Sequence, residues 1–283
     1  MSLGAVLARM GQNGGVLTLT SLSIYPLKSC AELPLTQALA EPLGLRHDRR
    51  WMVVDSEGTF MTGRNTPALV HLRAEPSATG LRLSAPGMRM LDVPLPSPEA
   101  PRLDVTVWND ACSAAHVQAG SDEWLSEYLG QPVRLAYVDE WMERPVERPH
   151  AAPEDRVGFA DGYPVLIATE ASLADLNQRL ARPVGMNRFR PNLVVSGGEA
   201  WAEDSWKRLR IGEVEFAVAK PCARCVFITV DPEHARRDAD REPLRTLATF
   251  RTRASKVLFG QNLLVRRPGA LKVGAPVEVL EAD

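Results

Sequence analysis

The sequence predicts a mostly β protein of the α+β class, in which a β-barrel is accompanied by an N-terminal β-rich domain and a few helices. Three observations support this prediction. Short apolar segments rich in β-branched residues recur at hairpin-like intervals along the 283 residues. The 22 prolines and 20 glycines indicate many turns. Only two segments carry clear helix signals, against roughly a dozen predicted strands.

The first half begins with residues 16–25, where apolar and hydroxyl side chains alternate as in a half-buried strand. A hairpin is expected next, with strands at residues 51–55 and 59–62 around a Ser-Glu-Gly turn. Later strands are expected at residues 69–74, 81–84, 91–93, 103–107 and 133–138.

The first helix is expected at residues 121–130, where Ser121 can cap the N-terminus and Gly130 can end the helix. A proline-rich segment at residues 143–153 follows and is typical of an exposed linker. We therefore expect two domains, residues 16–145 and residues 150–283.

The second half starts with a strand at residues 165–168 and a helix at residues 169–177, which presents leucines on one face and stops before Pro183. A short helix is expected at residues 246–253. Further strands are expected at residues 193–196, 208–211, 214–219, 225–230, 262–266 and 277–280.

The composition is typical of a soluble globular protein in a reducing compartment. The net charge of −2 and the absence of a basic run argue against a nucleic acid partner. Four cysteines in this length do not suggest a disulfide scaffold. The first fifteen residues lack the features of a signal peptide, and no apolar run is long enough for a membrane span. We expect a cytoplasmic protein.

The segment KPCARC at residues 220–225 carries the most distinctive chemistry. It leads into an apolar strand, which places two thiols and a guanidinium group at the rim of a sheet. Thiolates bind soft metals, and a neighbouring arginine lowers the pKa of a thiol. The same pair of cysteines could instead be half of a structural zinc site, a redox pair or two small buried side chains.

Three basic loop clusters accompany the cysteines, each at the beginning or end of a predicted strand. Lysine or arginine beside serine or asparagine donors suits a phosphate or another anion. For any single cluster, ordinary surface charges are the simpler explanation, so the hypothesis depends on several clusters converging. The clusters are Lys28 with Ser29, Arg46 with Arg49 and Arg50, and Arg188 with Arg190 and Asn192.

Other chemistries are less well supported. No dinucleotide-binding glycine motif, phosphate loop or nucleophile elbow is present. No second cysteine pair or histidine pair completes a zinc site, and His234 lies in a sequence typical of a surface turn. Asp161 and Asp231 flank strand ends and could handle protons, although Asp231 before a proline is more simply a turn former.

Taken together, the motifs resemble the molybdenum cofactor sulfurase C-terminal (MOSC) domain preceded by its N-terminal β-barrel domain. The N-terminal motif is YPLKSC at residues 25–30, with Asp48, Arg49 and Trp51. The MOSC motifs are TEASLADLN at 169–177, FRPN at 189–192, AEDSW at 202–206, CARC at 222–225, FGQN at 259–262 and KVG at 272–274. The resemblance covers nearly the whole chain, which is similar to the family of the mitochondrial amidoxime reducing component and its bacterial relatives. It implies that the two domains are interlocked around one site.

This resemblance implies a molybdenum cofactor, in which a pterin dithiolene (molybdopterin) and one protein cysteinate hold the metal. It assigns the cysteinate to Cys225 and places Asp161 close to the metal. The matching cofactor-binding positions are Lys28, Ser29, Arg49 and Arg190, with Asn192 and Arg224 nearby. One departure is Ala223, because relatives often carry serine between the two cysteines. At the family level, pyridoxal phosphate binding is also an expectation.

The implied function is a molybdenum-dependent oxidoreductase that reduces N-hydroxylated compounds, such as amidoximes, to amidines or amines. Many bacterial relatives carry a further iron–sulfur domain, and no such cysteine set follows here, so a separate ferredoxin- or flavoprotein-type reductase is expected to deliver electrons. Two alternatives remain. One is a non-catalytic carrier of the cofactor or sulfur-transfer module, and the other is a structural zinc or thiol-redox protein.

Overall fold

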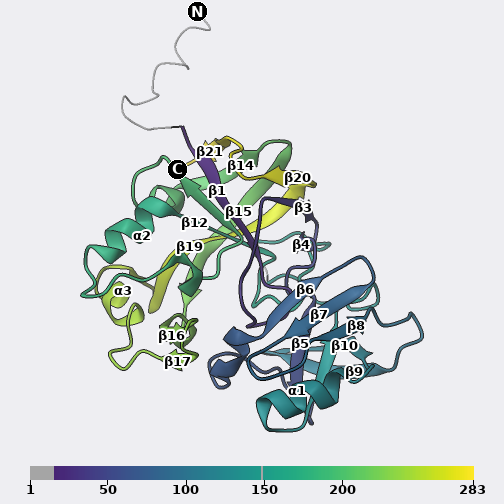
Figure 1. Cartoon of the computed structure of the whole chain (residues 1–283). Helices are drawn as coiled ribbons and strands as arrows, with labels where there is room; N and C mark the ends of the chain where they lie inside the picture. Colours follow the sequence, from purple (N-terminus) through teal and green to yellow (C-terminus); the bar gives the residue numbers. More distant parts are fainter. Residues whose placement is uncertain (1–15, 148) are drawn as a thin grey trace, which may run out of the picture.

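The computed structural model describes residues 16–147 and 149–283. Within these residues the chain forms 21 strands and three α-helices, together with four short 3₁₀ turns (Figure 1). The mostly β class expected from the sequence is therefore confirmed.

The largest sheet has nine strands and forms the barrel. Its alternating apolar side chains, such as Leu19 and Leu22, fill a common core. Leu19 N donates to Ala275 O (2.9 Å) and Val277 N donates to Leu17 O (2.8 Å), so the chain entering the last strand returns to the first. This closure covers backbone edges that would otherwise be open. In order, the strands are β2 (Leu33–Leu35), β1 (Thr18–Ile24), β13 (Leu193–Ser196), β12 (Val165–Thr169), β19 (Lys256–Arg267), β15 (Val214–Arg224), β14 (Trp206–Ile211) and β21 (Val277–Ala282), with β18 (Thr252–Arg253) beside β19.

The strand pairing does not follow the expected division of the chain near residue 145. Strand β1 pairs with β13 in antiparallel register, with Leu22 opposite Leu193. A small sheet also joins the two halves, because β3 (Gln37–Glu41) pairs with both β4 (Gly44–Leu45) and β20 (Gly269–Lys272). Residues 16–45 thus complete a barrel that the second half does not close alone.

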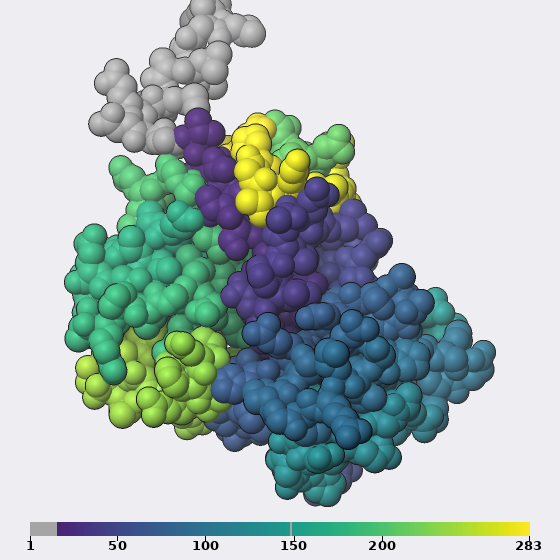
Figure 2. Space-filling model, in the orientation of Figure 1, coloured from purple at the N-terminus to yellow at the C-terminus, as the bar shows by residue number. Residues whose placement is uncertain are grey.

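Residues 51–138, which we call the inserted unit, form two further sheets that pack around a second apolar core. In Figure 1 these strands and α1 lie beside the barrel, and Figure 2 shows the two surfaces in contact. The first sheet contains β5 (Trp51–Asp55), β11 (Val133–Tyr137), β10 (Asp110–Val117) and β9 (Arg102–Val107), and the second contains β6 (Arg73–Pro76), β7 (Gly80–Ser84) and β8 (Leu91–Pro94).

The helices are short. Helix α1 (Ser121–Leu129) ends as expected at Gly130, whose φ of 68° suits glycine. The N-terminal cap is Gly120, not Ser121, because the Ser121 hydroxyl donates to Val117 O at 2.7 Å. The remaining elements are α2 (Glu170–Asn177), α3 (Leu244–Phe250), η1 (Pro67–His71), η2 (Met186–Arg188), η3 (Ala202–Asp204), η4 (Val226–Thr229), β16 (Val230–Asp231) and β17 (Arg236–Arg237).

The prediction of a strand at residues 225–230 is wrong. Strand β15 continues through the cysteine segment to Arg224, which pairs with Val257, and residues 226–229 form the 3₁₀ turn η4. The partner strand β19 begins at Lys256, so a longer β15 would have no backbone partner. Cys222 therefore lies in a strand, and Cys225 lies just after it.

Three smaller expectations also fail. Residues 59–62 make only isolated bridges, from Phe60 to Val54 and from Thr59 to Thr106, and not a return strand. Pro67 begins a 3₁₀ turn that ends at His71 and so occupies the first half of the strand expected at 69–74. Strand β10 was not expected, because its small and polar residues give little β signal, yet it pairs on both sides.

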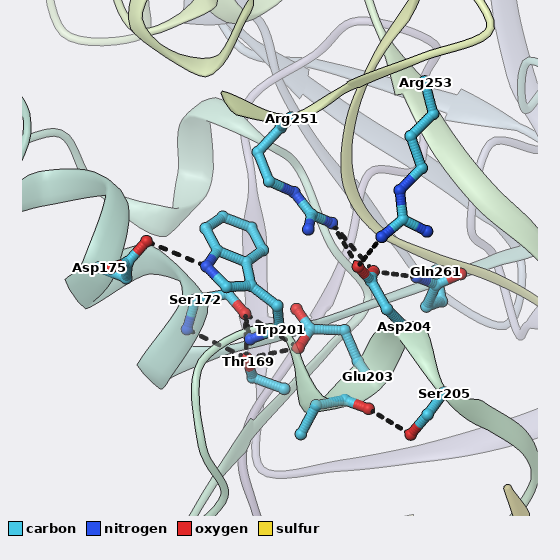
Figure 3. Close-up of polar contacts among 11 residues, drawn as sticks. Thr169, Ser172, Asp175, Trp201, Glu203, Asp204, Ser205, Arg251, Arg253 and Gln261 are labelled. Atoms are coloured by element: carbon cyan, nitrogen blue, oxygen red, sulfur yellow. Dashed lines mark hydrogen bonds and ion pairs between the residues drawn. The ribbon is translucent and has the colours of Figure 1, made fainter. Parts of the chain in front are cut away.

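A buried polar network fixes the start of α2 to the loop before β14 (Figure 3). Thr169 caps α2 by accepting from Ser172 N at 3.2 Å. The Thr169 and Ser172 hydroxyls both donate to Glu203 Oε2, at 3.0 and 2.9 Å. Next to it, Asp204 accepts from Arg251 at 2.7 Å and from Gln261 at 2.8 Å. These contacts explain why the TEASL and AEDSW motifs occur together.

Glu203 should make this network sensitive to pH. Its side chain is fully buried and its Oε1 atom has no hydrogen-bond partner. Burial raises the pKa of Glu203, although the Ser172 and Thr169 hydroxyls oppose the shift. Folding thus favours the protonated form of Glu203. The contribution of this group to the free energy of unfolding is fully present below the pKa of an unfolded glutamate, and it is lost as the pH rises through the pKa in the folded state.

We therefore expect Glu203→Gln to unfold at a higher temperature than the wild type above neutral pH, with the difference shrinking toward pH 4. Thermal unfolding between pH 4 and 9 measures this. The exposed Glu199→Gln is the matched control and should follow the wild type throughout. If the unfolding temperatures of Glu203→Gln and the wild type differed by the same amount at every pH, the raised pKa of Glu203 would be contradicted.

Candidate functional site

All eight site residues expected from the sequence line one cavity of about 280 Å³. They come from loops at the ends of β1, β4, β12, β13 and β15, and residues of the inserted unit complete the wall. Members of all three basic clusters therefore meet Cys225 at one cavity. The residues are Lys28, Ser29, Arg49, Asp161, Arg190, Asn192, Arg224 and Cys225.

Lys28 and Asp161 form an ion pair on one wall. Lys28 Nζ donates to Asp161 Oδ1 at 2.6 Å and to Phe159 O at 2.7 Å, and only 5% of the lysine side chain is exposed. Burial lowers the pKa of Lys28, while the charge and hydrogen bond of Asp161 oppose this and keep the ammonium paired.

Asp161 lies at the mouth of the cavity, with 64% of its side chain exposed. Desolvation by the surrounding protein would raise its pKa, but the charge and hydrogen bond of Lys28 outweigh this, aided by Arg64 and by Trp108 Nε1 at 3.2 Å. The pKa of Asp161 is thus held well below its usual range. At neutral pH it is an ionised acceptor and a poor proton donor.

Arg49 and Asn192 are linked by a hydrogen bond in the lining of the same cavity. Arg49 donates to Asp48 Oδ2 at 2.6 Å, to Asn192 Oδ1 at 3.2 Å and to Arg190 O at 3.1 Å. The Asn192 amide also accepts from Leu166 N and donates to Ser23 O, both at 3.1 Å. Because its hydrogen-bonding groups are already occupied, Asn192 is suited to hold Arg49 in place.

Arg190 retains donors for a ligand. Its Nη1 donates to Cys30 O at 2.6 Å, and a guanidinium group carries several further N–H donors. Ser29, Arg49 and Arg190 have positive φ angles of 69°, 47° and 55°. Such backbone is uncommon for residues other than glycine and is concentrated at functional sites. Three strained residues around one cavity support a binding role.

The two cysteines differ in their contacts. Arg224 Nη1 lies 2.9 Å from Cys222 Sγ, and Arg224 Nη2 donates to Phe189 O at 2.5 Å. Arg224 therefore contacts Cys222, because positions two apart in a strand share a face. Within the part of the chain that the structure describes, the Cys225 thiol has no hydrogen-bond partner and is free to bind a metal.

Several cavity residues were not found from the sequence. Arg64 comes from the inserted unit, where no distinctive pattern surrounds it, and Lys220 begins the KPCARC segment in β15 but was not proposed as a site residue. Arg144 acts from outside the lining: it donates to Gly158 O (2.8 Å), Ala160 O (2.5 Å) and Asp161 O (2.9 Å) and so fixes the loop that carries Asp161. A buried arginine of this kind has no sequence signature.

Some basic and histidine residues lie elsewhere. Arg46 and Arg50 pair with Glu41, at 2.7 and 3.5 Å, and do not line the cavity. His234 clusters with Asp231 and Glu233, which is the one group of metal-ligating side chains close enough to share an ion among residues 16–147 and 149–283. It contains neither cysteine, so the described residues offer no cysteine–histidine zinc set.

The site and fold define a barrel protein whose cavity combines cationic loops with an available thiol. The MOSC N-terminal beta barrel domain model matches residues 16–132, and the MOSC domain model matches residues 154–278. The chain belongs to this family, as the resemblance implied.

Its similarity to individual relatives is extensive. It is 37% identical to mitochondrial amidoxime-reducing component 1 of Homo sapiens, over 93% of this chain and 83% of that protein. It is 35% identical to component 1 of Xenopus laevis, over 91% and 80%. It is 33% identical to component 2 of Homo sapiens, over 92% and 82%. Pyridoxal phosphate binding gains no support from these names.

Proposed function

We propose that this protein is a molybdenum-cofactor-dependent oxidoreductase that reduces N-hydroxylated compounds to amidines or amines. In this reaction the substrate takes up two electrons and two protons, its N–O bond breaks, and the oxygen leaves as water. The observation that carries the proposal is the convergence of Lys28, Arg49, Arg190 and Cys225 on one cavity. The names of the relatives support the same reaction class.

The residues present fit the cofactor. The Cys225 thiol is a soft donor suited to molybdenum, and the donors of Arg190 suit the phosphate of a pterin. When bound, the cofactor supplies the two-electron chemistry, and the protein supplies position and charge. Lys28 and Ser29 would hold the pterin, and Arg49 and Arg190 its phosphate.

The remaining site residues support this arrangement. Asn192 keeps Arg49 in place, and Arg224 ties Cys222 to the Phe189 carbonyl. The ionised Asp161 would orient Lys28 and accept a hydrogen bond from a substrate or water at the cavity mouth. Because its pKa is depressed, we assign proton donation to solvent.

Electrons would come from a separate ferredoxin- or flavoprotein-type reductase. The one metal-binding group found among the described residues contains no cysteine, so those residues offer no iron–sulfur ligand set. None of the described helices is long and apolar enough to cross a membrane. The cytoplasmic setting expected from the sequence remains a prediction.

Elemental and pterin analysis, followed by an amidoxime reduction assay, tests the proposal. Protein made in a host that synthesises the cofactor should contain molybdenum and pterin in equal amounts. It should reduce an amidoxime with reduced methyl viologen and show no turnover with NADH alone. Zinc in place of molybdenum would favour the structural or redox alternative, and bound pterin without turnover would favour the carrier. Turnover with NADH alone would contradict the need for a partner.

A further inference from the structure

Tyr25 lies between the two arginines to which the proposed function assigns phosphate binding. The guanidinium carbon of Arg49 is 4.3 Å from the centroid of the Tyr25 ring, and that of Arg190 is 4.0 Å from it. Two guanidinium groups at these distances would overlap on a single face of the ring. They therefore occupy opposite faces, and the ring separates them.

This arrangement solves an electrostatic problem. Arg49 and Arg190 are like charges at one site, and each is removed from water by its surroundings. The face of an aromatic ring carries negative charge density, so a desolvated cation above it is attracted. A ring with a cation on each face keeps the two charges apart and stabilises both. An aliphatic side chain would separate them without this attraction.

The backbone and hydroxyl of Tyr25 also fix the two loops. Tyr25 N donates to Asp48 Oδ1 at 2.8 Å, and Arg49 N donates to Tyr25 O at 2.9 Å. The Tyr25 hydroxyl donates to Pro191 O at 3.4 Å, next to Arg190. Since Tyr25 is fully buried, the stack cannot rearrange without disturbing the core.

A second ring extends the stack. Phe227, from η4, lies 5.4 Å from the Arg190 guanidinium carbon. The Phe227 ring packs closely against Gly63 of the inserted unit, since a Cβ atom at position 63 would lie 2.3 Å from the ring. The order Arg49, Tyr25, Arg190, Phe227 thus joins elements from both halves of the chain.

We propose that Tyr25 is a positioning residue whose ring holds Arg49 and Arg190 as a two-guanidinium clamp for a phosphate monoester. The inference rests on the proposed function, because it takes the pterin phosphate as the ligand. It adds a requirement for an aromatic face at position 25, which a purely structural core residue would not have.

Calorimetric titration of the full chain with inorganic pyrophosphate tests the clamp, using cofactor-free protein at fixed low salt. Tyr25→Phe keeps the ring and should bind within about threefold of the wild type, since it loses one long hydrogen bond. A pentafluorophenylalanine at position 25 has nearly the same shape but reverses the charge of the ring face. It should weaken binding by about tenfold. Because the shape is retained, this variant is expected to fold, and circular dichroism with thermal unfolding checks that.

The same fluorinated residue placed in an Arg49→Ala, Arg190→Ala background should have no further effect, because the ring acts through the arginines. If Tyr25→Phe and the fluorinated protein bound pyrophosphate equally well, while Arg49→Ala and Arg190→Ala each bound it more weakly, the role of Tyr25 would be overturned and the arginine clamp would stand. Undiminished pyrophosphate binding by Arg49→Ala and Arg190→Ala would overturn the clamp and also the phosphate anchor of the proposed function.

Discussion

Cys225→Ser should remove molybdenum from the protein and lower the rate of reduction of N-hydroxylated substrates by at least about 100-fold. This loss should exceed the loss caused by replacing a residue that only hydrogen-bonds to a metal ligand. A serine hydroxyl is a hard donor that stays protonated at neutral pH, whereas a cysteine thiolate is a soft ligand. Metal analysis and viologen-driven amidoxime reduction measure the two effects.

Cys222→Ser is the matched control and should keep most of the activity. Its sulfur lies 2.9 Å from Arg224 Nη1, and a serine oxygen can accept the same hydrogen bond. Cys222 also lies within β15, whose ladder to β19 does not depend on the side chain. Equal loss of activity in two folded variants would show that the thiols act as a pair, as a zinc or disulfide role requires.

Arg190→Ala should weaken cofactor binding by about 10- to 100-fold, because each charge-assisted hydrogen bond to a phosphate contributes about 1.5–3 kcal/mol. The loss should appear as pterin released during purification and regained only at higher cofactor concentration. Quantification of bound pterin across a cofactor titration measures it.

Arg210→Ala serves as the control, because this exposed arginine pairs with Glu278 on the far strands of the barrel. Both variants should remain folded by circular dichroism. Full pterin occupancy in Arg190→Ala and in Arg49→Ala would contradict the phosphate assignment, whatever the activity of the proteins.

Local sequence patterns predicted most strands of the barrel. The alternation at residues 16–25 predicted β1, and the leucines on one face of residues 169–177 predicted α2. The patterns failed where a neighbour decides the structure. Residues 226–229 have strand-forming side chains but lie beyond the end of β19, and β10 has weak propensity but two partner strands.

The candidate site shows the same division. Apart from Asp161, the expected residues come from the basic and cysteine motifs of the sequence, and all eight line the cavity. The contacts within the set were not predictable in the same way. Asp161 was expected to handle protons, but a lysine 133 positions earlier in the chain keeps it ionised. The CARC motif did not show which thiol Arg224 contacts, and the extension of β15 places its guanidinium group on Cys222.

The sequence by itself determined the family, the mostly β class and the identity of the chemical groups, because each depends on residue type and spacing along the chain. Only the tertiary structure decided which thiol is free, which carboxylate is ionised and which ring separates the two arginines. Hydrogen bonds, ion pairs and stacking act over a few ångströms between segments far apart in sequence, so they follow from how the barrel closes. Tyr25 shows this most clearly: as a sequence position it is one aromatic residue before a proline, and in the folded chain it lies between Arg49 and Arg190.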